Sequence, residues 1–288
     1  MNIDDTYICN GVNVGTGHVN YEGAVLVNGD VTEKMQIKAE GDVTINGFVE
    51  SAHIESGGDI IITEGAMGKV NDSAGEFNCH LIAKGSIHVQ HGQGIEIHCS
   101  GNITVGRQLA YSKLHCGGAV IVGQIDKPMG NLFACDIVSQ DRIEAGTLGA
   151  VSGSMLKVDF SPGFAQLLER KDALDELVRQ LRENNSKHKE KIDILKSKKV
   201  PKELKTKVAE ALEMFDNENA LLDWIESKVL EISDAKVQYQ QDIKLIANKK
   251  LYPGVTAKLN NRNWRSEREY ERAHIHYDSH QWHYEPII

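Results

Sequence analysis

The sequence predicts a mainly β protein, a β-solenoid into which a long α-helical hairpin is inserted. Three observations support this prediction. A motif punctuated by glycine recurs before residue 160, and residues 1–160 hold 24 of the 26 glycines. Residues 162–242 follow a helical spacing, and strand-like alternation returns after residue 243. We therefore expect solenoid rungs over 1–160, a helical hairpin over 161–242, and strands over 243–288 that rejoin the solenoid.

The repeated unit can be written as apolar, any, small, any, Gly, polar, apolar, any, apolar. In the second copy, for example, it is Ile37-Lys-Ala39-Glu-Gly41-Asp42-Val43-Thr-Ile45. Apolar residues that alternate along the chain point to one side of a strand, so each unit predicts two short strands joined by a corner. The unit occurs seven times. A short opening copy lies at 25–31, five full copies lie at 37–45, 54–62, 81–89, 97–105 and 114–122, and a degenerate closing copy lies at 137–145.

The Gly-polar pair of each unit is expected to form the corner of the coil. We attribute its glycine to a positive φ, which residues with a Cβ adopt only at a cost. One rung cannot bury its apolar side alone, whereas stacked rungs share a continuous core. The small positions are expected to stack at a tight corner: Val27, Ala39, Ser56, Ala83, Cys99, Cys116 and Ser139.

The distance between equivalent corners varies, with steps of 12, 17, 27, 16, 17 and 23 residues. Loops of different length must therefore leave the coil, the longest at 68–77. Such irregularity excludes a strict prism of hexapeptide repeats, the fold of many acyltransferases.

Residues 162–242 predict two helices of about 36 and 41 residues, or roughly 54–62 Å at the helical rise. Ser161 and Pro162 favour a helix start, and Lys196, Lys198 and Lys199 suit a helix end. Apolar residues spaced by three and four form heptad seams on both sides of Pro201. Arms of matched length joined by a short turn favour an antiparallel coiled-coil hairpin over the alternative, a parallel dimer.

After the hairpin, alternation predicts strands over 243–247, 255–259 and 273–277, with Tyr252-Pro253-Gly254 as a turn. These strands would return to the solenoid, which makes the hairpin an insertion and not a tail.

Charge and composition exclude several classes of protein. Residues 1–160 carry 9 Lys+Arg against 19 Asp+Glu (net −10), and residues 161–288 carry 23 against 22 (net +1). The acidic first part would repel a nucleic-acid backbone and should favour partners with a basic or apolar patch. No apolar run approaches the ~20 residues of a membrane span, and Met1 to Tyr7 do not form a signal peptide. We expect a cytoplasmic protein.

Candidate metal ligands are few. His98 and His115 occupy one repeat position in neighbouring rungs, but a third ligand is not evident, so we interpret them as a solvated ladder. Cys99 and Cys116 are interpreted as small core residues. His274 and His276 share one strand face, with His280 and His283 near them; we interpret the first pair as an exposed face. The five cysteines show no C-x-x-C spacing, and the sequence assigns no catalytic, cofactor-binding or metal-binding residue.

Two functions remain open. The first is a non-catalytic scaffold or regulator that binds protein partners, in an oligomeric state that the sequence leaves undetermined. The alternative is a β-helix enzyme acting on polysaccharide, which would align acidic or arginine side chains on one outer face. The outward positions carry no paired carboxylates, which favours the scaffold: Lys38, Glu55, Ile82, His98, His115 and Val138.

The glycine corners, the helical insertion and the Leu251-Tyr252-Pro253-Gly254-Val255 motif after it resemble the bacterial flagellar assembly protein A (FapA) family over nearly the whole chain. The resemblance implies a right-handed parallel β-helix and a cytoplasmic role in flagellar assembly or its placement at the cell pole. It also implies coupling to signalling proteins of the sugar phosphotransferase system, and it brings no catalytic residues. The sequence lacks that family's usual N-terminal domain, as a fragment would, and its histidine-rich tail after Arg272 is not part of the family pattern.

Overall fold

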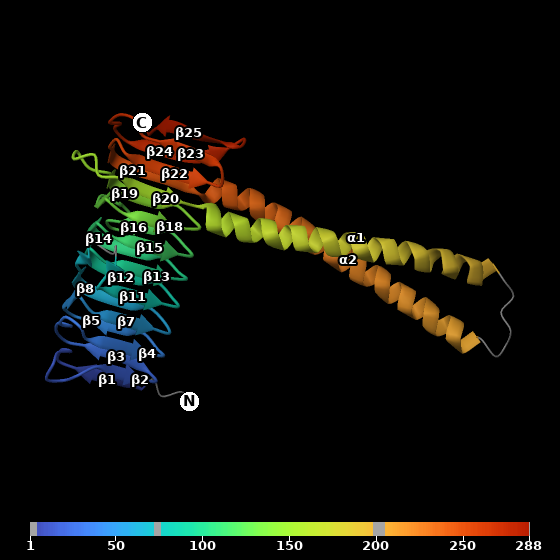
Figure 1. The fold of residues 1–288 in the computed structure, drawn as a ribbon, viewed down its shortest axis with the longest axis horizontal. Coiled ribbons are helices and arrows are strands. Elements are labelled where there is room, and N and C mark those ends of the chain that lie inside the picture. The colour runs from blue at the N-terminus through green and yellow to red at the C-terminus, as the bar shows by residue number, and fades with distance from the viewer. Residues whose placement is uncertain (1–4, 72–75, 198–204, 288) are drawn as a thin grey trace. The chain divides into compact units, whose positions relative to one another are not determined.

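The computed structural model describes residues 5–71, 76–197 and 205–287. Over this range the chain is mainly β, as predicted, with two α-helices (Figure 1). It divides into two compact units. One consists of Met1–Gly163 with Tyr239–Ile288 and the other of Phe164–Gln238.

The first unit contains a 10-stranded sheet and a 13-stranded sheet. The 10-stranded sheet follows the order β2 (Val19–Tyr21), β4 (Gln36–Ala39), β7 (His53–Ser56), β11 (His80–Ala83), β13 (Glu96–Cys99), β15 (Lys113–Cys116), β18 (Asp136–Val138), β20 (Leu156–Asp159), β22 (Val255–Leu259) and β23 (Arg262–Arg265). The 13-stranded sheet follows β1 (Thr6–Cys9), β3 (Ala24–Val27), β5 (Val43–Ile45), β8 (Ile60–Met67), β12 (Ile87–Gln93), β14 (Ile103–Ala110), β16 (Val120–Val122), β19 (Ile143–Leu148), β21 (Lys244–Leu251), β24 (Ala273–Asp278) and β25 (Gln281–Pro286), with β6 (Phe48–Glu50) beside β8 and β17 (Asn131–Phe133) beside β14 and β19.

Successive turns of the chain add one strand to each sheet, and each strand pairs in parallel with its equivalent in the next rung, as Figure 1 shows. Several strands of the 13-stranded sheet shift register midway, for example between Val89 and His91. Such a bulge bends a strand and gives the rung a further corner. The loop at 68–77 contains a separate antiparallel pair, β9 (Val70–Asn71) with β10 (Glu76–Phe77).

The core consists of columns of apolar side chains, one from each rung, as the alternation predicts. In the first nine strands of the 10-stranded sheet, one inward-pointing residue of each strand pairs with its equivalent in the next strand, and these side chains are fully or almost fully buried. Burial of each Val, Leu or Ile among them stabilises the fold by about 1.5–3 kcal/mol. This column runs through Val19, Ile37, Ile54, Leu81, Ile97, Leu114, Ile137, Val158 and Ala257.

The explanation of the corner glycines by a positive φ is wrong. Gly41, Gly58 and Gly85 are not among the residues with positive φ. Their constraint is close approach instead: a Cβ on Gly58 would lie 2.0 Å from Asp42 Oδ1, in the rung before it, and one on Gly85 would lie 2.0 Å from Asp59 Oδ1. Left-handed backbone occurs at a different corner, two residues before strands of the 10-stranded sheet, mostly without glycine: Lys34, Ser51, Gly94, Tyr111 and Ala134.

The polar residue after each corner glycine forms a ladder along the coil. Asp42 Oδ1 accepts a hydrogen bond from the Asp59 backbone N–H at 2.7 Å, and Asp59 Oδ1 accepts one from the Ser86 N–H at 2.7 Å. The series continues to Ser86 Oγ, which accepts from Asn102 N–H, and to Asn102 Oδ1, which accepts from Ala119 N–H. This polar corner ladder satisfies backbone donors that would otherwise lack partners at the bend.

The predicted position of the opening copy, residues 25–31, is also wrong, because it begins at the second strand of a rung instead of the first. Val25 to Val27 form β3, which pairs with β5 in the 13-stranded sheet, whereas the first strand of each full copy lies in the 10-stranded sheet. The in-register copy covers residues 19–27, and Tyr21, not Val27, pairs with Ala39. The error arose because Gly29-Asp30 imitates the corner motif while lying at another bend.

The second unit is built from α1 (Ser161–Ser197) and α2 (Lys205–Asp242). Three residues of the predicted seams, Val178, Ile192 and Ile225, are buried, as is Phe164 at the start of α1. Polar pairs join the helices: Arg182 with Glu226, Asn185 with Asn219, and His188 with Glu218. Residues that come later in α1 pair with residues that come earlier in α2, which is the pattern of two antiparallel helices. Pro201 lies outside the described residues, and neither described helix has the apolar stretch needed to cross a membrane.

Along the chain, the two helices stand between β20 and β21. At this point the Tyr239 hydroxyl donates a hydrogen bond to the Phe160 carbonyl oxygen at 2.6 Å. After the insertion, β21 pairs in parallel with β19 and β22 with β20.

The end of the chain has a feature that the alternation did not predict. β23, β24 and β25 pair antiparallel with their neighbours and do not add further parallel rungs. Short hairpins of this kind cover the open edge that a parallel solenoid would otherwise present.

Candidate binding surface on the 10-stranded sheet

The outer face of the 10-stranded sheet carries two columns of side chains, because residues that alternate with the buried column point outward. The outward positions predicted from the repeat are confirmed here; each of these side chains is exposed or half-buried. One column contains Lys38, Glu55, Ile82, His98 and His115, and the other contains Gln36, His53, His80, Glu96, Lys113, Asp136 and Lys157.

Charged groups of these columns pair between rungs. Glu96, whose side chain is only 17% exposed, lies 3.0 Å from Lys113 Nζ and 3.3 Å from both His80 and His98. Burial alone would raise the pKa of this carboxyl, but the hydrogen bonds and charges of Lys113 and His98 lower it below its usual range. In the same way, His53 and then Lys38 lower the pKa of Glu55.

His98 and His115 stack as predicted, with ring centroids 5.3 Å apart and an interplanar angle of 9°. Burial, followed by the charges of His98 and Lys113, lowers the pKa of His115. The carboxylate nearest His98 is Glu96, which Lys113 already neutralises, so this pair offers a poor place for a metal. Beside them, Cys116 is buried and Cys99 half-buried, and burial raises the pKa of their thiols to about 11 and about 12. Both therefore remain protonated and unreactive.

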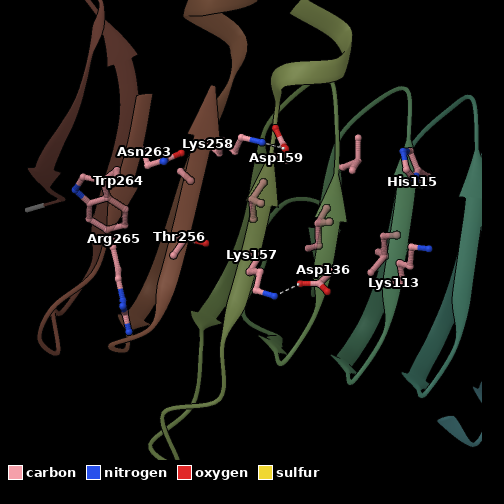
Figure 2. Close-up of a pocket in the computed structure, with 15 residues that line it drawn as sticks. Lys113, His115, Asp136, Lys157, Asp159, Thr256, Lys258, Asn263, Trp264 and Arg265 are labelled. Carbon is pink, nitrogen blue, oxygen red and sulfur yellow. Dashed lines mark hydrogen bonds and ion pairs between the residues drawn. The ribbon is translucent and has the colours of Figure 1, made fainter. Parts of the chain in front are cut away.

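At the C-terminal end of this face the sheet is hollowed into a groove of about 540 Å³ (Figure 2). Figure 2 shows Lys113, His115, Asp136 and Lys157 on neighbouring strands, with Trp264 and Arg265 on the strand at the far side. Ion pairs span the groove: Lys157 lies 3.4 Å from Asp136, and Lys258 lies 2.8 Å from Asp159. The full lining is Lys113, Leu114, His115, Asp136, Ile137, Val138, Lys157, Val158, Asp159, Thr256, Ala257, Lys258, Asn263, Trp264 and Arg265.

The charge of the groove differs from that of the chain around it. Its lining contains four cations, three lysines and Arg265, against two carboxylates, Asp136 and Asp159. The expectation of an acidic face that favours basic partners is therefore wrong for this surface, because the excess acids of residues 1–160 lie elsewhere. Of the four cations, Arg265 is the one whose side chain makes no hydrogen bond or ion pair with another described residue.

The groove does not favour the polysaccharide enzyme. A glycosidase needs one carboxylic acid with a raised pKa beside a second carboxylate. Burial alone would raise the pKa of Asp159, but hydrogen bonds from Lys258 and Ser161 lower it. Asp136 is paired with Lys157. Asp159 thus remains an ion and cannot donate a proton to a leaving group.

Of the residues that line this groove, only His115 and Val138 were among the outward positions predicted from the repeat. Lys258, Trp264 and Arg265 follow the helical insertion by more than 15 residues, and no local motif relates them to Lys113 or Asp136. The one available signal was the alternation at 255–259, which places Thr256 and Lys258 on the outer face.

The four histidines of the C-terminal tail, which the sequence offers as candidate metal ligands, do not line the groove. His274 and His276 belong to β24, His280 to the turn after it and His283 to β25, all in or beside the 13-stranded sheet. The interpretation of the first pair as exposed is wrong: their side chains are only 31% and 23% exposed.

We expect Glu96→Gln to lower the free energy of unfolding by about 1–2 kcal/mol at neutral pH. The substitution removes the carboxylate that interacts with His80, His98 and Lys113. The pKa of Glu96 in the folded chain is below its ordinary value of 4.5. Its stabilisation is therefore complete above that value and disappears as the pH falls through the folded pKa. Urea unfolding across this range should show the two proteins converging in acid. The exposed Glu40→Gln serves as control; a constant difference at every pH would contradict the prediction.

Comparison with protein families agrees with the resemblance. The model of the flagellar assembly protein A beta solenoid domain (FapA) matches residues 5–282 of 288. Searches among curated proteins and among solved structures give no significant match. The matched range includes both helices and every strand except the last four residues of β25. The chain therefore belongs to the flagellar assembly protein A family, over its beta solenoid domain.

Proposed function

We propose that this chain is a non-catalytic scaffold of flagellar assembly, which acts in the cytoplasm and binds a protein partner in the groove of the 10-stranded sheet. One observation carries the proposal: the lining of the groove includes the half-buried Trp264 and the exposed Arg265, whose side chain has no ion pair with another described residue. Tryptophan and arginine are the residues that most often anchor protein interfaces.

The charges of the groove indicate the kind of partner. Its lysines are already neutralised by Asp136, Asp159 and Glu96, so Arg265 is the cation available to a ligand. The partner segment would thus carry an acidic side chain for Arg265 and an apolar one for Trp264. Because part of this attraction is electrostatic, association should weaken as salt rises.

The finer features of the fold belong to the same proposal. We propose that the solenoid is right-handed, since about 98% of parallel crossover connections within a sheet have that hand. The helices form an antiparallel coiled-coil hairpin inserted at 161–242, with 1–160 and 243–288 making the solenoid. The seam burial and the Arg182–Glu226 pair support this geometry. A hairpin with arms of 37 and 38 residues offers a second binding surface about 56 Å long.

The proposal extends to the cellular context that the family implies. The scaffold would be placed at the cell pole, and its partner would be a flagellar component or a signalling protein of the sugar phosphotransferase system. Support for this part is the family membership together with the charged groove.

The test is complementation of a deletion strain of the host organism, with flagellar number and position scored by electron microscopy. The double variant Trp264→Ala/Arg265→Glu should fail to restore normal flagella, because it removes the aromatic anchor and reverses the unpaired charge. The control Arg107→Glu makes the same charge change on β14 of the other sheet, at an exposed position, and should restore them. Immunoblots verify equal amounts of each protein.

Two outcomes would contradict the proposal. Normal flagella in the deletion strain would reject the flagellar role, and full rescue by the groove variant would reject the groove as the binding surface. Turnover of a polysaccharide by the purified chain, lost on a single groove substitution, would restore the enzyme alternative.

A further inference from the structure

The closing hairpin brings three metal-ligating side chains together on one face. His274 and His276 alternate along β24, and Glu285 stands opposite His274 on β25. Each contributes one ligand atom, and these atoms all lie within 4.8 Å of one another. Glu285 Oε2 is 3.8 Å from His274 Nδ1 and 4.0 Å from His276 Nδ1.

These distances are too long for hydrogen bonds, and two ring nitrogens are left without partners. His274 Nε2 and His276 Nδ1 are buried from solvent and have no hydrogen-bond partner. Burying a polar atom without a partner costs about 1–3 kcal/mol, so such atoms are rare in folded proteins unless a ligand satisfies them. Here two of them occur on adjacent outward positions of one strand.

We propose that His274, His276 and Glu285 bind a divalent transition metal, with Zn²⁺ as the ion that fits best. Two imidazoles and a carboxylate form a ligand set that suits zinc, with bonds of about 2.0–2.2 Å. Tetrahedral bonds of that length place the ligand atoms about 3.4 Å apart. The side chains therefore have to close by little more than an ångström.

A third imidazole lies beside the pair, because His283 stands opposite His276 on β25. His283 stacks on His276 with centroids 5.6 Å apart, and its Nε2 donates to the Asp278 carbonyl oxygen. That bond leaves its Nδ1 as an acceptor next to the site.

Lys244 is the opposing group, since it pairs with His276 from the neighbouring strand β21. Its ammonium would repel a cation, and the other β21 residue on this face, Ile246, contributes no charge. The arrangement thus predicts a site weakened by one lysine. Its role would be to join β24 to β25, the two strands that close this edge of the 13-stranded sheet.

The test is calorimetric titration of Zn²⁺ into the purified chain, without an affinity tag and after removal of metals with a chelator. We expect one saturable site per chain. His274→Ala and His276→Ala should each weaken binding by about 100-fold or more, and Glu285→Gln by about 10-fold. Lys244→Gln should strengthen binding by about 3-fold or more, because a nearby positive charge is removed. His91→Ala removes a histidine from β12, which does not neighbour β24 or β25 in the sheet, and should leave Zn²⁺ binding unchanged.

Co²⁺ absorption provides a second readout, which does not depend on the stability of the variants. Ligation by nitrogen and oxygen gives visible bands without the thiolate charge-transfer band that a cysteine ligand would add. Absence of saturable Zn²⁺ binding, unchanged binding in His274→Ala, or a thiolate band with Co²⁺ would each overturn the proposal. Flagellar complementation by His274→Ala separates this site from the groove, since the proposed partner contacts are untouched.

Discussion

Gly58→Ala should destabilise the solenoid by about 2–4 kcal/mol, well beyond an ordinary surface substitution. The new Cβ would lie 2.0 Å from Asp42 Oδ1, and Asp42 Oδ1 accepts the hydrogen bond from the Asp59 N–H. The methyl group and the polar corner ladder cannot both occupy this space. Either the two rungs separate, or the bond breaks and leaves a backbone donor unsatisfied. Chemical denaturation monitored by circular dichroism measures the loss.

A double-mutant cycle shows whether the clash is the cause. Asp42→Ala removes the clashing oxygen together with its hydrogen bond, so it should cost about 1–2 kcal/mol alone. In the combined variant the added methyl group meets no carboxylate, and the loss should be clearly smaller than the sum of the single losses. Additive losses would indicate that Gly58 is required for another reason, such as its backbone conformation.

Leu81→Ala should lower the free energy of unfolding by about 3–4 kcal/mol, within the range for buried leucines. Leu81 is fully buried and pairs with Ile54 on one side and Ile97 on the other. Its truncation leaves a cavity in the middle of the apolar column, and neighbouring rungs cannot collapse into it because their spacing is set by backbone hydrogen bonds. Urea titration measures the effect.

The adjacent residue provides a matched control. Ile82 lies on the same strand but points outward and is 37% exposed. Ile82→Ala should therefore cost less than about 1 kcal/mol. Equal losses at the two positions would contradict the inward and outward assignment on which the groove and the buried column both depend.

The sequence alone determined the elements that obey short-range rules. Alternation decided which side chains of each strand are buried, as Leu81 and Ile82 show. The Gly-polar pairs of the full copies located the corners, and the spacing of three and four residues located α1 and α2. Each rule depends on contacts between residues close along the chain or in equivalent positions of a repeat, so it is visible without knowledge of the fold.

What the sequence could not determine depends on which rungs become neighbours. The reason for the corner glycines is the close approach of Gly58 to Asp42 in the rung before it, which only the tertiary structure shows. The groove required β22 and β23, which follow the helical insertion in the chain, to continue the sheet beyond β20. The ligand cluster required an antiparallel hairpin to set Glu285 opposite His274.

These features share one physical reason. A steric limit, a groove and a ligand set are properties of distances between residues far apart in sequence, and register between strands fixes those distances. The alternation of a strand constrains which face a residue occupies but not the strand it pairs with. Local chemistry therefore specified the solenoid rungs of this protein, and only the stacking of the rungs and the closing hairpin specified its candidate sites.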